Sequence, residues 1–237
     1  MAASTSLRPF WRRTLKLVAV ILAGLLLLPY LLTPLYLFGE PVSTLMLTRW
    51  AAGARVERPW VPLEAMAKSL LPVLVIAAED ARFCRHRGID LVEIREAIGD
   101  ADSLSDLRGA STLSQQTAKN LFLWPGRNLL RKFLETPLAL WLDLVLGKRR
   151  LLEIYLNIAE WGPNGEFGAE AAARRAFGKS ARDLRPHEAA LLAAALPNPT
   201  KRNPGRPGPG LRRLARIYER RAATPRIAAC LAPRARR

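Results

Sequence analysis

Cysteine and histidine are scarce in this chain of 237 residues. It contains two cysteines, Cys84 and Cys230, and two histidines, His86 and His187. Two cysteines cannot build the multi-bridge framework of a small disulfide-stapled secreted domain. The four residues together also fall short of a histidine-rich metal cluster or of a four-cysteine zinc site. The sequence therefore excludes a disulfide-stapled domain and a zinc enzyme, and it predicts no metal-ligand set.

Acidic residues are also few, with 20 Asp and Glu against 37 Lys and Arg, a net charge of +17. Such an excess predicts an anionic partner, which can be a nucleic acid, a phosphate-bearing ligand or an anionic membrane surface. Hydrophobic residues make up 50% of the chain, enough for a packed core, so the composition excludes wholesale disorder.

Charge is absent altogether between Leu17 and Gly39. At a rise of about 1.5 Å per residue, a helix of this length reaches the roughly 30 Å of a bilayer's hydrocarbon. A cleaved signal peptide is the alternative, but its apolar core runs to only about 7–15 residues and ends at a small-x-small site, which this segment lacks. We therefore predict an uncleaved transmembrane anchor over 17–39, kinked or loosened in its second half by Pro29 and Pro34.

The charges that flank this run predict its orientation. Residues 1–16 carry four cations and no acid, whereas Glu40 is the first charge after the run and Arg49 the next cation. The positive-inside rule then keeps residues 1–16 in the cytoplasm and sends the rest across the membrane. That topology argues against nucleic acid as the anionic partner and favours lipid head groups or lipid-linked phosphates.

Beyond the anchor, the pattern predicts a connecting segment over 40–60, a helical domain over 61–205 and a basic tail over 206–237. Apolar positions recur at helical spacing through the domain, and alternating strand patterns are missing. From Lys201 onward there are twelve Lys and Arg against one acid, Glu219. Two interpretations of the tail stay open. It is either a solvated, partly disordered segment with a short helix over 211–222, or a surface that adheres to anionic lipid.

The first polar cluster of the domain centres on Glu79, which follows the apolar run 74–78. On a continuous helix, Val75 and Phe83 share its face. A carboxylate bordered by apolar groups has a raised pKa, which suits a general base near neutral pH. The alternative is a surface Glu-Asp pair at the end of a helix.

The second cluster, residues 109–120, places Gln116, Lys119 and Asn120 at i, i+3 and i+4. Amide and ammonium donors then share one helical face, close to the free N–H groups of a helix N-terminus. This arrangement suits a sugar or a polyanion. A solvated helix face is the alternative.

Two later clusters are open to the same double interpretation. Arg127, Arg131 and Glu135 repeat every four residues, which predicts either ordinary ion pairs or a cationic stripe for a pyrophosphate with a carboxylate beside it. Glu153 and Asn157 share a face of an amphipathic segment, and we expect Glu153 to be a buried structural carboxylate.

Taken in order, these segments resemble the family 51 peptidoglycan glycosyltransferases, the polymerase module also found in bifunctional penicillin-binding proteins. The matching patterns are E-D-x-x-F-x-x-H-x-G-x-D, G-x-S-T-x-x-Q-Q-x-x-K-N, R-K-x-x-E, L-E-x-Y-L-N and E-A-A-x-L-A-A-x-L-P. They fall on Glu79–Asp90, Gly109–Asn120, Arg131–Glu135, Leu152–Asn157 and Glu188–Pro197. The S-x-x-K and K-T-G motifs of a transpeptidase are absent from the chain. The resemblance is therefore to the monofunctional, membrane-anchored biosynthetic transglycosylases of bacteria.

The resemblance implies a mainly α, lysozyme-like helical transglycosylase domain behind a single N-terminal transmembrane helix. It implies that lipid II is polymerised by inverting transfer from an undecaprenyl-pyrophosphate-linked chain to the 4-hydroxyl of an acceptor N-acetylglucosamine. Glu79 takes the position of the general base and Glu135 that of a second catalytic carboxylate. For Glu135 three roles stay open: orienting the cations, holding a divalent ion (Mg or Mn) at the pyrophosphate, or assisting the leaving group.

The candidate substrate-binding residues come from the same motifs. They are Asp80, Phe83, His86, Thr112, Gln115, Gln116, Lys119, Asn120, Arg127, Arg131 and Lys132. We expect the four cations to face the pyrophosphate, and Asp80 and His86 to orient their neighbours.

The expected partners are lipid II, the growing glycan strand and membrane lipids, with cell-division proteins as further candidates and no nucleic acid. The expected location is the bacterial inner membrane, with the catalytic domain in the periplasm. Two rival functions remain: a lysozyme-like enzyme that cleaves glycan, which has no use for cations around Glu135, and a non-enzymatic membrane scaffold of the division machinery.

Overall fold

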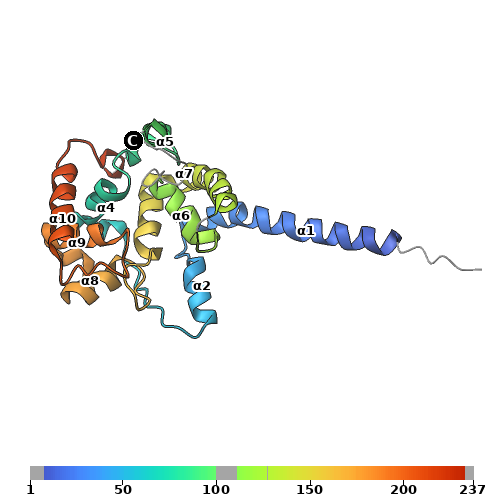
Figure 1. Cartoon of the computed structure of the whole chain (residues 1–237), viewed down its shortest axis with the longest axis horizontal. Coiled ribbons are helices and arrows are strands. Elements are labelled where there is room, and N and C mark those ends of the chain that lie inside the picture. The colour runs from blue at the N-terminus through green and yellow to red at the C-terminus, as the bar shows by residue number, and fades with distance from the viewer. Residues whose placement is uncertain (1–7, 100–110, 127, 233–237) are drawn as a thin grey trace, which may run out of the picture.

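The computed structural model describes residues 8–99, 111–126 and 128–232, and this part of the chain is built from helices (Figure 1). Across these three ranges there are no named strands, only isolated bridges. The α-helices are α1 (Arg8–Leu32), α2 (Thr44–Ala51), α3 (Leu63–Met66), α4 (Leu71–Glu79), α5 (Leu91–Gly99), α6 (Leu113–Phe122), α7 (Leu129–Ile158), α8 (Ala169–Phe177), α9 (Pro186–Ala195) and α10 (Pro209–Ala222). The predicted mainly helical fold behind one apolar N-terminal helix is confirmed.

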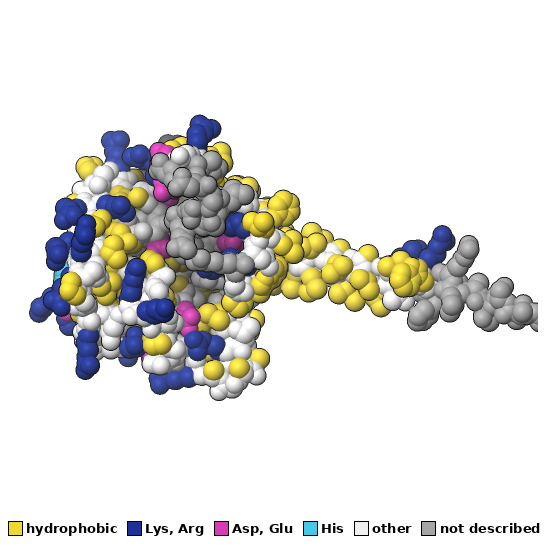
Figure 2. Space-filling view, viewed as in Figure 1, with side chains coloured by type: hydrophobic (Ala, Val, Ile, Leu, Met, Phe, Trp, Pro, Cys, Tyr) yellow, Lys and Arg dark blue, Asp and Glu magenta, His cyan; other side chains and the backbone are white. Residues whose placement is uncertain are grey.

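The N-terminal helix α1 projects from the body as an apolar rod, with Lys and Arg side chains near its outer end (Figure 2). Within the 27 residues Trp11–Leu37, the most apolar 18-residue stretch has a mean hydropathy of 2.4, and none of that stretch is buried in the protein. Pro29 lies inside α1, which ends at Leu32. A 3-10 turn with Pro34 near its start continues to Leu37. By length and composition, this segment is compatible with a single-pass anchor.

The inner end of α1 is fixed to the helical body. The Trp141 indole Nε1 donates a hydrogen bond to the Tyr30 carbonyl at 3.2 Å, and the two rings lie 6.0 Å apart. The Tyr36 ring stacks on Phe122 at 5.9 Å between centroids, and Arg150 Nε donates to the Tyr36 carbonyl at 2.8 Å. Contacts to both α6 and α7 therefore hold the base of the anchor against the domain.

The core of the domain forms around α4 and α9, which are apolar on every side. Seven-residue stretches of both helices are almost entirely buried, from Leu71 to Ala77 and from Ala189 to Ala195. Helices that lack a polar face must be enclosed by others; α10 packs against both of these helices, α3 packs against α4, and α8 packs against α9. The segment predicted as a connection, 40–60, contains α2, and the Thr44 hydroxyl ties this helix to the Leu123 carbonyl at 2.6 Å.

The basic C-terminal segment folds onto this core as helix α10. It buries Leu211, Ala215 and Tyr218 at helical spacing against α9 and α4 and leaves its arginines outside. Packing therefore continues past the expected boundary at residue 205, and the predicted short helix is part of the domain. Helix α10 lies at the end of the body opposite α1 (Figure 1), a placement that does not favour adhesion to a bilayer spanned by α1.

One disulfide joins Cys84 to Cys230 across 146 residues, with 5.4 Å between their Cα atoms. The sequence analysis counted these cysteines only as too few for a framework, and their pairing was not predicted. The bridge ties the C-terminal 3-10 turn Ala229–Leu231 to the turn Phe83–Arg85, which follows the end of α4. The disulfide therefore holds the segment after Glu79 in place through Cys230, which lies far from it in the sequence.

Replacing Cys230 with Ser is expected to lower the free energy of unfolding by about 2–4 kcal/mol, because a crosslink over so long a loop restricts the unfolded chain. Denaturant unfolding of the detergent-solubilised protein, followed by circular dichroism, measures the change. A reductant is expected to lower the midpoint of the unsubstituted protein and to leave that of Cys230→Ser unchanged. Equal midpoints for the unsubstituted protein with and without reductant would contradict a stabilising bridge.

Candidate active site

Glu79 is the last residue of helix α4. The next residue, Asp80, has a non-helical backbone conformation (φ −163°, ψ 73°). Glu79 Oε2 accepts a hydrogen bond from Gln116 Nε2 at 2.9 Å. Its Oε1 is buried and has no hydrogen-bond partner among the described residues. Burial raises the pKa of Glu79, although the Gln116 hydrogen bond and the charges of Lys119 and Arg202 act in the opposite direction. The site therefore holds a carboxylate with raised proton affinity and one oxygen left to accept a proton.

The orientation of Gln116 is set by Tyr155, a residue that the sequence analysis did not include in the site. The buried Tyr155 hydroxyl donates to Gln116 Oε1 at 3.0 Å, which turns the amide N–H₂ group toward Glu79. Burial and the Glu79 charge raise the pKa of Tyr155 well above its ordinary value, so it remains a neutral donor. Its position in the matched L-E-x-Y-L-N pattern could have indicated a role in the site. The apolar helix face around Tyr155 is, however, typical of a core residue.

Asp80 and His86 fix the start of α6 beside Glu79. Asp80 Oδ2 accepts the backbone N–H of Leu113 at 2.9 Å, and His86 Nε2 lies 3.0 Å from both Asp80 carboxylate oxygens. Thr112 caps α6 in a capping box with Gln115, and its hydroxyl also donates to the Gly88 carbonyl at 2.6 Å. The Thr112 hydroxyl and the Gln115 amide oxygen thus position the start of α6, and Thr112 also lines a cavity beside Glu79. Their assignment as substrate contacts stays a prediction.

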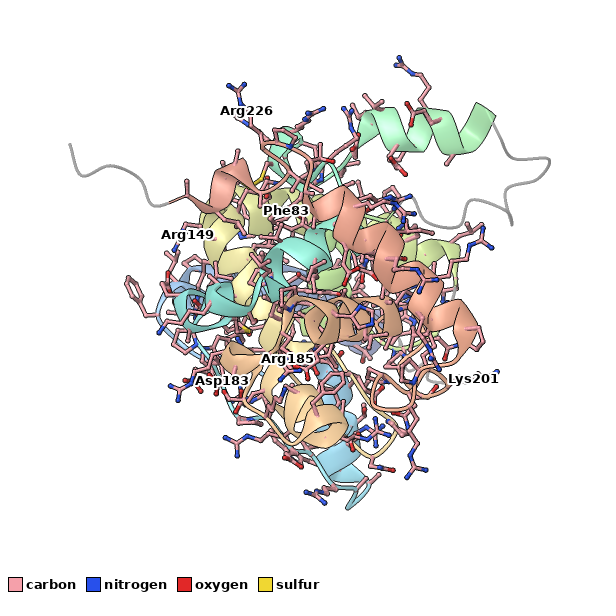
Figure 3. The ribbon with its side chains drawn as sticks, turned by 90° about the vertical axis from the view of Figure 1, so that its left-hand side faces the viewer. Phe83, Arg149, Asp183, Arg185, Lys201 and Arg226 are labelled. Atoms are coloured by element: carbon pink, nitrogen blue, oxygen red, sulfur yellow. A yellow bond between two sulfur atoms is a disulfide. The ribbon has the colours of Figure 1, made fainter. Side chains whose placement is uncertain are left out.

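Phe83 lies elsewhere than expected. The prediction that it shares a helical face with Glu79 is wrong, because α4 ends at Glu79 and Phe83 begins a separate 3-10 turn. Its side chain is completely buried, with Lys148 Nζ 4.4 Å from the ring centroid, and Figure 3 shows it inside the ribbon, away from the outward-pointing Arg226 and Lys201. Phe83 is therefore a core residue and not a substrate contact.

Lys119 is close enough to both carboxylates predicted to be catalytic for each of their charges to act on its pKa. Burial lowers the pKa of Lys119, while the negative charges of Glu135 and Glu79 act to raise it. Arg131 Nη1 contacts Glu135 Oε2 at 3.1 Å, and both side chains are buried. The structure thus brings Glu79, Lys119, Arg131 and Glu135 into one region, as the motifs predicted.

Lys132 joins the same cluster and is more exposed. Its ammonium donates to Ser111 Oγ at 2.8 Å and lies 4.0 Å from Glu135 Oε1. Burial lowers the pKa of Lys132, and the Glu135 charge acts to raise it. Arg127, the fourth predicted cation, lies outside the described residues.

The side chains around Glu135 are not suitable ligands for a divalent cation held by the protein. Its nearest charged neighbours are the cations Arg131 and Lys132, and no group of three or more acidic, His or Cys residues gathers anywhere in the described part of the chain. Mg²⁺ and Mn²⁺ take oxygen ligands and are repelled by such cations. The geometry therefore favours the orienting role for Glu135.

Two cavities open at opposite ends of α6, and Glu79 lines the first of them. The first, about 240 Å³, is lined by Glu79, Asp80 and Thr112 and by Arg221 of α10. The second, about 390 Å³, lies toward α2, and Lys119, Asn120 and Arg131 line it together with apolar residues that include Leu45, Leu123 and Trp124. Because Lys119 and Arg131 line the second cavity, it can take an anionic group, and we call it the cation cavity.

Two cations near Glu79 were missed by the sequence analysis, which placed them in the domain's last loop and in the basic tail. Arg202 donates to the Ala194 carbonyl at 2.8 Å, and its charge acts to lower the pKa of Glu79. Arg221 lines the first cavity. Both are more than 120 positions from Glu79 along the chain, so no local pattern could indicate this proximity.

The L-E-x-Y-L-N segment has a structural role apart from Tyr155. Glu153 Oε2 accepts the Leu63 N–H at 3.1 Å, and its other oxygen pairs with Arg150. Asn157 is fully buried and exchanges two hydrogen bonds of 2.9 Å with the backbone of Val61. These bonds tie the entry to α3 onto α7 and leave the carboxylate of Glu153 outside the site.

Comparison with known proteins identifies the architecture around this site. Residues 44–224 match the family model described as Transglycosylase. The chain belongs to the transglycosylase family. The proteins named "Biosynthetic peptidoglycan transglycosylase" from Nitrobacter winogradskyi and Rhodopseudomonas palustris strain TIE-1 are each 56% identical to it. The first aligns over 92% of this chain and 96% of its own length, the second over 94% of both.

A third relative of the same name, from Mesorhizobium japonicum, is 53% identical over 92% of this chain and 91% of its own. These matches confirm the resemblance inferred from the motifs, the lysozyme-like helical fold and the assignment of this transglycosylase as a glycosyltransferase. The match to the family model begins at α2 and ends beyond α10, so it includes both helices that the composition had placed outside the domain.

Proposed function

We propose that this transglycosylase polymerises lipid II into peptidoglycan strands. Two observations carry the proposal: the buried Glu79 Oε1 has no hydrogen-bond partner among the described residues, and Lys119 is close enough for its charge to interact with both Glu79 and Glu135. A base next to a cation cavity is what transfer from a sugar pyrophosphate requires. The names of the relatives support peptidoglycan as the product.

In the proposed reaction, the 4-hydroxyl of the acceptor N-acetylglucosamine donates its proton to Glu79 Oε1 as its oxygen attacks the anomeric carbon of the donor. Gln116, oriented by Tyr155, holds the other carboxylate oxygen in place. The bond from the anomeric carbon to the phosphate oxygen breaks on the opposite side, so the configuration inverts. The pyrophosphate leaves with the bonding electron pair.

The charge that grows on the leaving pyrophosphate falls in the cation cavity. Arg131 is held there before the reaction by its ion pair with the buried Glu135, and Lys119 lies partly buried within reach of the Glu135 charge. Preorganised cations stabilise the transition state more than the ground state, in which less charge has developed on the leaving oxygen. A hydrolase that cleaves finished glycan releases no pyrophosphate and gains nothing from these buried cations.

The proposed location is the bacterial inner membrane, with α1 as the anchor and the catalytic domain in the periplasm. Helix α1 has the length and hydropathy to span a bilayer. The Cys84–Cys230 bridge adds support, because disulfides persist in oxidising compartments and are rare in the cytosol.

The test incubates the full chain in detergent with lipid II and, separately, with finished glycan, and resolves both products on a gel. A ladder of growing strands from lipid II, with finished glycan unchanged, is the expected result. Shortening of the finished glycan would replace the proposal with the lysozyme-like function. No change in either substrate would favour a non-enzymatic scaffold.

A further inference from the structure

A third cavity, of about 240 Å³, opens where the end of α10 meets the turn that follows α4. Three cations line it: Arg85 of that turn, Arg221 in the last turn of α10, and Arg226 of the loop that follows. Among the described residues, no Asp or Glu lines this space, and none of the three arginines forms an ion pair. All three side chains are exposed, so a group arriving from solvent can reach them. We call this space the arginine cavity.

The arginine cavity adjoins the first cavity of the active site, and Ala81 and Arg221 line both spaces. The two spaces differ in charge. The first cavity carries several acidic residues, namely Glu79, Asp80, Asp90 and Glu93. An anionic group attached to a sugar beside Glu79 is therefore repelled by the acids of the first cavity and attracted by the arginine cavity next to it.

The loop that carries Arg226 has a backbone conformation that is unfavourable for an arginine. Residues 224–227 form a turn, in which the Ile227 N–H donates to the Thr224 carbonyl at 3.3 Å and Pro225 takes the second position. Arg226 takes the third position with a φ of 67°, where such a turn normally has Gly or Asn. Backbone strain of this kind is typical of functional sites. A side chain is therefore retained at a position whose backbone favours glycine.

We propose that the arginine cavity binds a free carboxylate of the peptide that peptidoglycan substrates carry on their sugars. This inference rests on the proposed function and adds the part of the substrate that this side of the active site recognises. Guanidinium groups match a planar carboxylate with paired N–H donors. The cavity is smaller than the roughly 300 Å³ at which pockets begin to enclose a whole small ligand, so it suits a substituent of the sugar and not the sugar itself.

A pyrophosphate is the competing anion, and the place of the cavity in the fold argues against it. The pyrophosphate of a lipid-linked sugar stays close to the bilayer, for which α1 is the proposed anchor. The end of α10 and the loop after it lie away from α1 (Figure 1). The peptide, in contrast, branches from the sugar and not from the lipid. It can pass from the first cavity into the arginine cavity along Ala81 and Arg221.

Two variants and a matched control test the assignment. Arg226→Gly removes one guanidinium and gives the turn the residue that its φ favours, so the unfolding midpoint is expected to stay equal or to rise. Arg221→Gln removes a second guanidinium from the same cavity. The control, Arg220→Gln, removes the same charge from the neighbouring position of α10, where the side chain is exposed and lines neither cavity.

The probes are two forms of lipid II, one with free peptide carboxylates and one in which these are amidated, titrated against the full chain in nanodiscs. The unsubstituted protein and Arg220→Gln are expected to prefer the free-carboxylate form by about tenfold. Arg226→Gly and Arg221→Gln should each reduce this preference by about two- to fivefold, the usual range for an exposed ion pair. Equal affinities of the unsubstituted protein for both forms, or a preference that neither variant reduces, would overturn the proposal.

Undecaprenyl pyrophosphate, which has no peptide, serves as a third probe. Arg226→Gly and Arg221→Gln are expected to bind it as tightly as the unsubstituted protein does. A loss as large as that seen with lipid II would assign the arginine cavity to a pyrophosphate and would overturn the proposal. These titrations need no turnover, so the peptide preference can be present even when no growing strand appears on the gel. The failure of this inference and that of the proposed function are therefore distinguishable.

Discussion

Replacing Glu79 with Gln is expected to lower the rate of lipid II polymerisation by about 10³-fold, since an amide cannot take the proton of the acceptor hydroxyl. The substitution keeps the size of the side chain, and the new amide oxygen can still accept the hydrogen bond from Gln116. Binding of lipid II should therefore change little. Single-turnover kinetics with purified protein and labelled lipid II separate the chemical step from binding.

The matched control is Glu93→Gln, which neutralises an exposed carboxylate beside the same first cavity. It is expected to polymerise lipid II at nearly the rate of the unsubstituted protein. If Glu79→Gln retains a rate within about tenfold of this control, another group accepts the proton and Glu79 is not the base.

The Glu79→Gln substitution is also expected to change how the stability of the protein depends on pH. The pKa of Glu79 is raised in the folded protein by burial, so the folded state binds the proton more tightly than the unfolded chain. Its contribution to stability is present below the ordinary pKa of a glutamate and is lost as the pH rises through the raised folded-state pKa. Glu79→Gln removes this loss and is expected to be at least as stable as the unsubstituted protein at neutral pH. A drop in its unfolding midpoint would show that the rate loss reflects misfolding.

Helical spacing was sufficient to predict the residues around Glu79 wherever the helix is continuous. Gln116 and Lys119 share one turn of α6, and Arg131 and Glu135 share one of α7, so positions three and four apart are neighbours in both. The same rule failed for Phe83, because α4 ends at Glu79 and no local sequence pattern marks that end. The backbone there is set by the Asp80 carboxylate, which is drawn to the start of α6 by a contact 33 positions away.

The C-terminal segment was harder to predict, for a different physical reason. Its many arginines dominate the composition and are typical of a solvated tail, whereas three apolar residues at helical spacing, Leu211, Ala215 and Tyr218, are what bind α10 to the core. That spacing could have indicated a packed helix. The Cys84–Cys230 pairing and the approach of Arg202 to Glu79 depend on tertiary contacts and left no local pattern.

Replacing Lys119 with Ala is expected to weaken binding of polyprenyl pyrophosphate by about 10- to 100-fold, the usual effect of losing a hydrogen bond to a charged group. Lys119 lines the cation cavity and is partly buried, so water screens its charge less than that of a fully exposed lysine. The polymerisation rate should fall as well, since the leaving pyrophosphate loses a preorganised cation. Titration with undecaprenyl pyrophosphate in nanodiscs measures the affinity without the need for turnover.

Two further variants distinguish a pyrophosphate contact from general electrostatics. Lys132→Ala removes the same charge from a side chain that is 44% exposed, so solvent screening should limit its effect on affinity to a fraction of that of Lys119→Ala. Lys119→Arg retains a cation and should recover part of the affinity. The lowered pKa of Lys119 also predicts that affinity for the pyrophosphate falls as the pH rises toward the ordinary lysine pKa, and that this fall is absent in Lys119→Arg. If the unsubstituted protein and Lys119→Ala bind undecaprenyl pyrophosphate with equal affinity, Lys119 does not contact the pyrophosphate. The cation cavity is then not the site that binds the leaving group.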